Sequence, residues 1–281
     1  GEMPLAVMGI SDWTHINSID YNEEFDQIAL SSRNMSELYI IDHSTTTQEA
    51  SEHSGGNSGK GGDILYRWGN PMNYNRGTIE DKMLTGQHDV NWIEAGYPGE
   101  KNLLLFNNGA TTGFGENFIN SSIVEISTPI DSVGNYYIED SEYFGPETLT
   151  WFYSSDFFSH IMSGARRLSN GNTLITSATE MRIFEIDENS SIVWDYIHEE
   201  EGQTAISKAF KYSESYFSLS DNYSGDINGD LVADIFDIIL LINFILEFNE
   251  PTESEFDSAD INQDGVLGVN DILMLLENIL N

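Results

Sequence analysis

Apolar and polar residues alternate along most of the first 220 residues, in short segments that turn-forming residues separate. Segments of this kind, with turns such as Asn108-Gly109 and Asn170-Gly171 between them, are typical of β-strands. One apolar strand recurs at a spacing of about 71 to 75 residues: Ile28-Ala29-Leu30, Leu103-Leu104-Leu105 and Thr173-Leu174-Ile175. The first module therefore contains an internal repeat and is predicted to be mainly β.

Each repeat continues with two further strands. An alternating strand comes next (37–42, 123–126 and 182–187), and an aromatic strand comes last (64–68, 148–153 and 192–196). Such four-stranded units are predicted to be the blades of a partial β-propeller with about three to four blades, and the aromatic residues Trp68, Trp151 and Trp194 to pack in its core. Three blades do not close a ring, so we expect that the N-terminal half of the ring is missing. A sandwich or an open sheet is the alternative fold.

The composition changes sharply near residue 220. Residues 221–281 carry 14 Asp and Glu and neither Lys nor Arg. We therefore divide the chain into a propeller fragment, 1–219, and a small all-α domain, 220–281. Two amphipathic helices are predicted in the second domain, at 235–247 and 269–280.

Two loops in this acidic region have the ligand spacing of an EF-hand-type calcium loop, with oxygen donors at positions 1, 3, 5, 7, 9 and 12. The second loop begins 34 residues after the first, has Gly265 at the sharp turn, and has Gly268 at position 9, where a water would replace the side chain. A solvated acidic tail would not show this spacing twice. The predicted ligands, with Val232 and Val266 acting through their carbonyls, are Asp226, Asn228, Asp230, Val232, Asp234, Asp237, Asp260, Asn262, Asp264, Val266 and Asp271.

The chain has a net charge of −36, from 47 acidic residues against 11 Lys and Arg. This charge limits the kinds of molecule that the chain is expected to bind. Nucleic acid is not expected as a partner, because binding phosphates requires clustered basic residues. No apolar run reaches the roughly 18 residues that would span a membrane. The chain has no cysteine, so disulfides give no information on its compartment.

Two histidines occupy the same position in successive repeats. His15 and Asn17 open the first repeat and His88 opens the second, while Arg33 ends the strand that follows His15. If the repeats are blades, both imidazoles start an innermost strand, and together with the amide and guanidinium they form a site for an anion. The alternatives are that the histidines only tie inner strands together, that Arg33 pairs with a nearby carboxylate (Asp12 or Asp89), or that Asn17 is a turn residue.

The first module resembles the PAPS-independent arylsulfate sulfotransferases over residues 5–215. The motifs that carry the resemblance are Asp12-Trp13-Thr14-His15-Ile16-Asn17, Ser31-Ser32-Arg33, Trp68-Gly69-Asn70-Pro71, Gly86-Gln87-His88-Asp89, Phe106-Asn107-Asn108-Gly109, Ser163-Gly164-Ala165-Arg166-Arg167-Leu168 and Asn170-Gly171-Asn172-Thr173-Leu174-Ile175. This resemblance implies a six-bladed ring and transfer of a sulfuryl group from an aryl sulfate to a phenolic acceptor, through a sulfohistidine and without PAPS. It implies that His88 is the nucleophile, and that His15, Asn17 and Arg33 hold the sulfuryl oxygens. A further histidine that the family takes from an earlier blade has no counterpart before His15.

The second module resembles a type I dockerin over residues 225–281. This resemblance implies two calcium ions, a cohesin-type partner, and a secreted, periplasmic or cell-surface bacterial protein. One departure concerns the partner: where cellulosomal dockerins often carry Ser-Thr, this chain has Ile235-Phe236 and Val269-Asn270. A non-catalytic, ligand-binding propeller anchored through its dockerin is the alternative to an enzyme.

Overall fold

The computed structural model describes residues 12–109, 120–138, 142–199, 202–212, 225–230 and 232–280. Its Cα packing divides the chain into two units, Gly1–Lys211 and Tyr212–Asn281. The first unit consists of β-sheets and the second of helices, as the sequence predicts.

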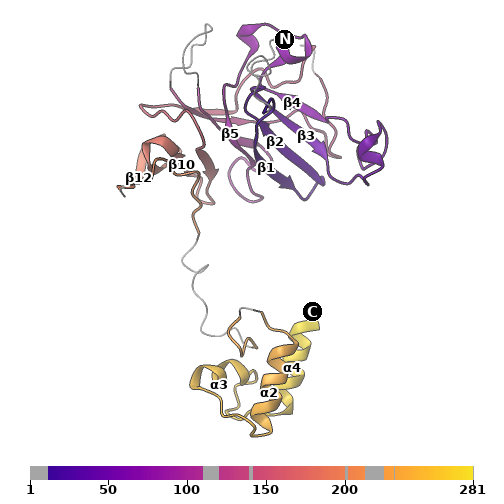
Figure 1. Ribbon diagram of the computed structural model, residues 1–281, viewed down its shortest axis with the longest axis vertical. Coiled ribbons are helices and arrows are strands. Elements are labelled where there is room, and N and C mark those ends of the chain that lie inside the picture. The colour runs from indigo at the N-terminus through magenta and orange to yellow at the C-terminus, as the bar shows by residue number, and fades with distance from the viewer. Residues whose placement is uncertain are drawn as a thin grey trace. The chain divides into compact units, whose positions relative to one another are not determined.

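Three antiparallel sheets of four strands each make up the first unit, and in each sheet the strands are neighbours in chain order. Figure 1 shows the strands of the first sheet side by side. The first sheet contains β1 (Ile16–Asn22), β2 (Gln27–Ser32), β3 (Glu37–Asp42) and β4 (Tyr66–Trp68). The second contains β5 (His88–Trp92), β6 (Leu103–Asn107), β7 (Ser122–Ile126) and β8 (Trp151–Tyr153), and the third β9 (Gly164–Arg167), β10 (Thr173–Ser177), β11 (Arg182–Ile186) and β12 (Ile192–Ile197). This up-and-down order is that of successive propeller blades, so the prediction of a partial propeller is confirmed.

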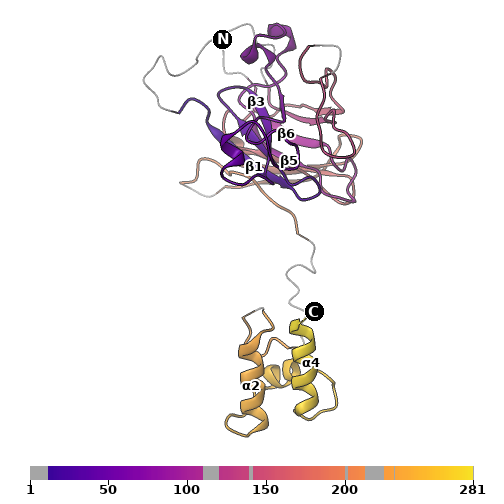
Figure 2. The same cartoon turned by 90° about the vertical axis from the view of Figure 1, so that its right-hand side faces the viewer.

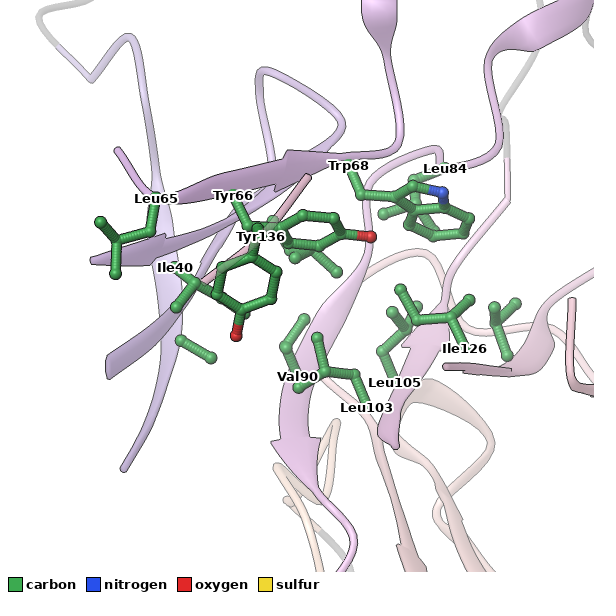
Figure 3. Close-up of a cluster of buried hydrophobic side chains, with 13 residues drawn as sticks. Ile40, Leu65, Tyr66, Trp68, Leu84, Val90, Leu103, Leu105, Ile126 and Tyr136 are labelled. Atoms are coloured by element: carbon green, nitrogen blue, oxygen red, sulfur yellow. The ribbon is translucent and has the colours of Figure 1, made fainter. Parts of the chain in front are cut away.

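The middle sheet is buried on both faces, which explains why its apolar strand is continuous rather than alternating. Successive side chains of a strand point to opposite faces. Leu103 and Leu105 of β6 accordingly pack in a cluster with residues of the first sheet, among them Ile40, Tyr66 and Trp68 (Figure 3). Leu104 and Phe106 pack in a second cluster with Ala165, Ile175 and Phe184 of the third sheet. The blades are therefore held together by apolar contacts between their faces.

The outer strands are less regular than the sequence predicts. β4 and β8 are only three residues long, and of the three tryptophans predicted in the core only Trp68 is fully buried. Trp194 is 48% exposed, because β12 is the edge strand of the third sheet and all of its residues are exposed among the described parts of the chain. The prediction that Trp194 packs in the core was wrong. Short 3₁₀ helices lie in the connections: η2 (Glu49–Ser51), η3 (Pro71–Tyr74), η4 (Ile79–Asp81) and η5 (Ala178–Glu180).

A buried ion pair offers a test of the first sheet. The side chain of Glu37 is fully buried and accepts two hydrogen bonds from Arg67, at 2.8 and 2.5 Å. We expect Arg67→Met to lower the free energy of unfolding by about 3 kcal/mol, because it leaves a buried carboxylate without its cation. Arg182→Met, which breaks the more exposed pair with Asp195, should cost about 1 kcal/mol or less. Denaturant titration followed by tryptophan fluorescence measures both, since all five tryptophans precede residue 212.

The second unit consists of three helices, α2 (Ile235–Ile245), α3 (Glu253–Ala259) and α4 (Val269–Leu280). Helices α2 and α4 lie side by side (Figure 2). Capping boxes start α2, at Asp234 with Asp237, and α3, at Thr252 with Glu255. A core around Leu241, Ala259 and Leu275 joins the three helices. Helix α3 is an addition to the two helices predicted.

In the described part of the chain, no helix has the length and apolar character needed to cross a lipid bilayer.

Candidate functional site

His15 and His88 occupy equivalent places in the first two blades. His15 immediately precedes β1, and His88 is the first residue of β5, so both lie at the start of the first strand of a sheet. The pairing register shifts just after each of them, between Ile16 and Ser18 and between His88 and Asn91. His15 itself has φ +49°, and Asp89, next to His88, has φ +57°. Each bulge bends the first strand of its sheet close to the histidine. Such irregularities are often found where side chains point into functional sites.

The hydrogen bonds of His88 define its tautomer. Its ring is 8% exposed, and Nδ1 faces two acceptors, the Gly86 carbonyl at 3.0 Å and Oδ1 of Asn108 at 2.8 Å. Nδ1 must therefore carry the proton. Nε2 accepts a hydrogen bond from the Met162 backbone N–H at 3.2 Å and keeps the lone pair. In this tautomer, Nε2 is the nucleophilic atom.

Burial lowers the pKa of His88 below its ordinary value of 6.5. The hydrogen bond to Asn108 and that to Gly86 oppose this shift, while the electrostatic effects of Arg33 and His15 reinforce it. His88 is therefore neutral at neutral pH, as a nucleophile has to be.

This pKa shift predicts a pH dependence with a definite sign. The folded state binds fewer protons at His88 than the unfolded state below pH 6.5, so this contribution to stability is complete above pH 6.5 and is lost as the pH falls through the folded-state pKa. The acid limb of any activity that needs neutral His88 should correspondingly lie below pH 6.5. Rates measured in stopped assays between about pH 4.5 and 8 test this expectation. An acid limb above pH 6.5 would contradict the assigned environment.

The structure brings the other three predicted residues next to the start of β5. The Nδ2 atom of Asn17 donates to the Gln87 carbonyl at 2.8 Å, which ties β1 to the residue before His88. Arg33 follows β2, and its backbone N–H donates to the His15 carbonyl at 3.1 Å. Arg33 and His15 both act electrostatically to lower the pKa of His88. Nδ1 of His15 forms a short hydrogen bond with Asp12.

The carboxylates that Arg33 was expected to pair with in the alternative reading have other partners. Asp12 pairs with His15, and Asp89 accepts from Arg166 at 2.8 Å and from Lys208 at 3.2 Å. Gly164 lies against Asp89 so closely that an added Cβ would come within 2.3 Å of Oδ2. The third blade thus fixes the residue that follows His88.

Sequence reasoning missed the groups that orient His88, namely Gly86, Asn108 and Met162. Asn108 lies in a motif that the sequence analysis quoted, but its role could not be found from spacing, because its contact with His88 crosses from β5 to the end of β6. Backbone groups such as the Met162 N–H leave no signal in a sequence.

The two predicted calcium loops fold into compact, hydrogen-bonded turns. At position 12 of the first loop, Asp237 is fully buried and accepts from the backbone N–H groups of Ile227, Asn228 and Asp234. The equivalent Asp271 is also fully buried and accepts from Asn262 and Gly268. Asp226 and Asp260, at position 1 of each loop, accept from the N–H of Asp230 and Asp264 respectively. Both loops have the same internal pattern.

The donor set suits calcium, which prefers carboxylate and carbonyl oxygens in a flexible loop. Several carboxylates gather in a region without any Lys or Arg, so a bound cation would offset their repulsion. Among the residues that the structure describes, no three acidic or histidine side chains already converge as a metal cluster. The individual ligands therefore stay a prediction.

His43 and His53, which carry no motif, pair with Asp26 and Asp63 in the bladed unit.

The fold and the two kinds of site define a bladed β-domain, with a buried neutral imidazole near a guanidinium, joined to a helical module with paired calcium loops. The chain belongs to the Arylsulfotransferase (ASST) family, which matches residues 4–218. Residues 224–280 match the Dockerin type I domain, a calcium-binding module. The predicted fusion of these two families is thus confirmed.

Solved structures similar to the chain include propeller proteins, at low similarity. BamB from Moraxella catarrhalis is 10% identical with a TM-score of 0.32, over 65% of this chain and 37% of that protein. The WD40 domain of Toxoplasma gondii coronin is 9% identical with a TM-score of 0.34, over 66% of this chain and 36% of that domain. The chain thus spans little more than a third of the length of each. No curated protein matched the chain.

Proposed function

We propose that this chain is an aryl sulfotransferase that moves a sulfuryl group from an aryl sulfate to a phenolic acceptor by a ping-pong mechanism with a sulfohistidine at His88. PAPS has no part in this mechanism. The observation that carries the proposal is the environment of His88: a buried imidazole whose Nδ1 faces two acceptor oxygens, and whose pKa is lowered by burial and by the charge of Arg33.

In the first half-reaction, the Nε2 lone pair attacks sulfur, and the S–O bond to the aryl oxygen breaks. The phenolate leaves with the bonding electron pair, and Nδ1 keeps its proton. In the second half-reaction, the acceptor oxygen attacks the sulfur of the sulfohistidine, its proton passes to a base, and the S–Nε2 bond returns its electrons to His88. The Met162 N–H has to release Nε2 before attack, since both need the same lone pair.

Arg33, Asn17 and His15 are proposed to hold the sulfuryl oxygens. Transfer of this type has charge spread over the peripheral oxygens, so positioned donors lower the barrier. Arg33 offers a permanently charged fork of N–H groups. The Asn17 amide has a second N–H besides the one that donates to Gln87. The imidazole of His15, oriented by Asp12 through Nδ1, presents Nε2 for hydrogen bonding or for proton exchange with the phenol.

The helical unit is proposed to bind two calcium ions, one in each loop, and to attach the enzyme to a cohesin-type partner. Exposed apolar residues on α2 support a protein partner: Ile235 is 56% and Phe236 64% exposed, at the positions where the chain departs from Ser-Thr. Attachment through a dockerin suits a secreted or cell-surface bacterial protein, or one in the periplasm.

The test is turnover of 4-nitrophenyl sulfate with and without phenol, together with intact-mass analysis of the protein without acceptor. The proposal expects phenol-dependent release of nitrophenol and a sulfuryl adduct on the peptide that contains His88. Saturable binding of the ester by the folded protein, with neither release nor adduct, would instead favour the non-catalytic binding propeller.

A further inference from the structure

The carboxamide of Asn108 is held from both ends. Asn108 follows β6 directly and is 1% exposed. Its Nδ2 atom faces two carbonyl oxygens, those of Ser159 at 2.7 Å and Met162 at 3.1 Å. Only an N–H group can face two carbonyls favourably, so the amide cannot be flipped, and Oδ1 must point at His88. Because Oδ1 is solely an acceptor, it requires a proton on Nδ1 of His88.

The Asn108 amide also holds Met162, whose backbone N–H faces Nε2 of His88. Met162 and Ser163 have φ values of +53° and +80°, which are strained for residues with side chains. The two hydrogen bonds from Nδ2 of Asn108 hold this segment, and within it the Met162 N–H points at Nε2 of His88. The Asn108 side chain therefore acts on both ring nitrogens of His88. It fixes the proton on Nδ1, and it positions the Met162 N–H that faces Nε2.

We infer that Asn108 is a positioning residue that selects Nε2 of His88 as the atom to be sulfurylated. This inference rests on the proposed sulfotransferase function and adds the group that fixes the nucleophile. When Nε2 forms its bond to sulfur, the ring keeps its Nδ1 proton and gains positive charge. The oxygens of Asn108 and Gly86, both neutral, then stabilise that charge as acceptors.

A neutral acceptor suits this role better than a carboxylate. A carboxylate at Nδ1 would favour the protonated imidazole and leave less neutral His88 at neutral pH. The guanidinium of Arg33 lowers the pKa of His88 and so favours the neutral ring. The Asn108 oxygen is neutral. It therefore orients the ring without adding a negative charge that would raise the pKa of His88.

The experiment compares Asn108→Ala and Asn108→Asp with the neighbouring Asn107→Ala in the full chain. Asn107 is equally buried, and its Oδ1 accepts a hydrogen bond from the Thr85 N–H at 2.8 Å instead of one from His88. Long-range ¹H–¹⁵N spectra of ring-labelled histidine give the tautomer, with the His88 signals identified by their absence from a His88→Gln sample. Rates of adduct formation from 4-nitrophenyl sulfate are measured as a function of pH.

We expect wild-type protein and Asn107→Ala to show the Nδ1–H tautomer of His88. Asn108→Ala should show a mixture of tautomers and form the adduct about 10- to 100-fold more slowly, since Gly86 still favours a proton on Nδ1. Asn108→Asp should move the acid limb of the rate to higher pH, a change that mere loss of stability does not produce.

An unchanged tautomer and an unchanged adduct rate in Asn108→Ala would overturn the inference, and so would an Nε2–H tautomer in the wild-type protein. If the variants fold poorly, the wild-type spectrum still tests the inference, because an Nε2–H tautomer would overturn it. If the wild-type protein forms no adduct at all, the proposed function fails, while comparison of the tautomer in wild-type protein and Asn108→Ala still tests the role of Asn108.

Discussion

Replacing His88 with alanine should abolish both turnover of 4-nitrophenyl sulfate and formation of a covalent sulfuryl adduct. The expected fall in kcat/KM is at least about 10³-fold, because the substitution removes the atom that forms the covalent intermediate and no nearby residue replaces it. His15 is not expected to substitute, because it lies at the start of a different blade and its side chain is 42% exposed rather than buried. Initial rates with phenol, and intact mass without it, measure the two effects.

His53→Ala is the matched control for this substitution. The side chain of His53 is 89% exposed and pairs with Asp63 in a connection far along the chain from β5. The control should keep wild-type rates and the adduct. Full activity in His88→Ala, with the adduct on another residue, would contradict the assignment of His88 as the nucleophile.

Chelating calcium should unfold the helical unit while leaving the bladed unit intact. Residues 221–281 carry 14 acidic residues and no Lys or Arg, and Asp237 and Asp271 are fully buried in their loops. Without a cation these carboxylates repel one another, so the free energy of metal binding contributes to the free energy of folding. Addition of EDTA should therefore remove most of the helical circular dichroism at 222 nm from α2, α3 and α4. Tryptophan fluorescence should not change, since no tryptophan lies in this unit.

Two aspartates give a matched pair for the same test. Asp237→Ala should raise the calcium concentration needed for refolding by at least about 10-fold, because it removes a predicted ligand and the acceptor of three backbone N–H groups. Asp257→Ala, at an exposed position of α3, should not. Equal effects of the two substitutions would mean that general charge, rather than the loop, governs the response to calcium.

The bladed fold could be predicted because each repeat shows the same order of apolar strands and turn residues over short stretches of sequence. Leu103-Leu104-Leu105 and its two counterparts mark the strand at the centre of each blade, and the Asn-Gly turns mark where strands end. The prediction failed where the burial of a residue depends on contact with a neighbouring sheet. Trp194 has the same aromatic pattern as Trp68, yet it lies exposed, because no further layer in the described residues covers β12. Helix α3 was missed because only seven residues, five of them polar, form it.

The sequence predicts the members of the candidate site but not their protonation. His15 and His88 are predicted because the repeat places them at equivalent positions, and the calcium loops because ligand spacing within twelve residues is a property of the sequence itself. Which nitrogen of His88 carries the proton depends on Gly86, Asn108 and Met162, which approach from three separate segments.

The sequence by itself determined the β and helical modules, the strands of the blades and the spacing of both acidic loops, because each of these follows from short-range periodicity, spacing or repetition. Only the tertiary structure decided the burial of His88, its lowered pKa and its tautomer. Desolvation and hydrogen bonding depend on groups that meet across blades, and their sequence separations of 20 residues to Asn108 and 74 to Met162 carry no periodic signal.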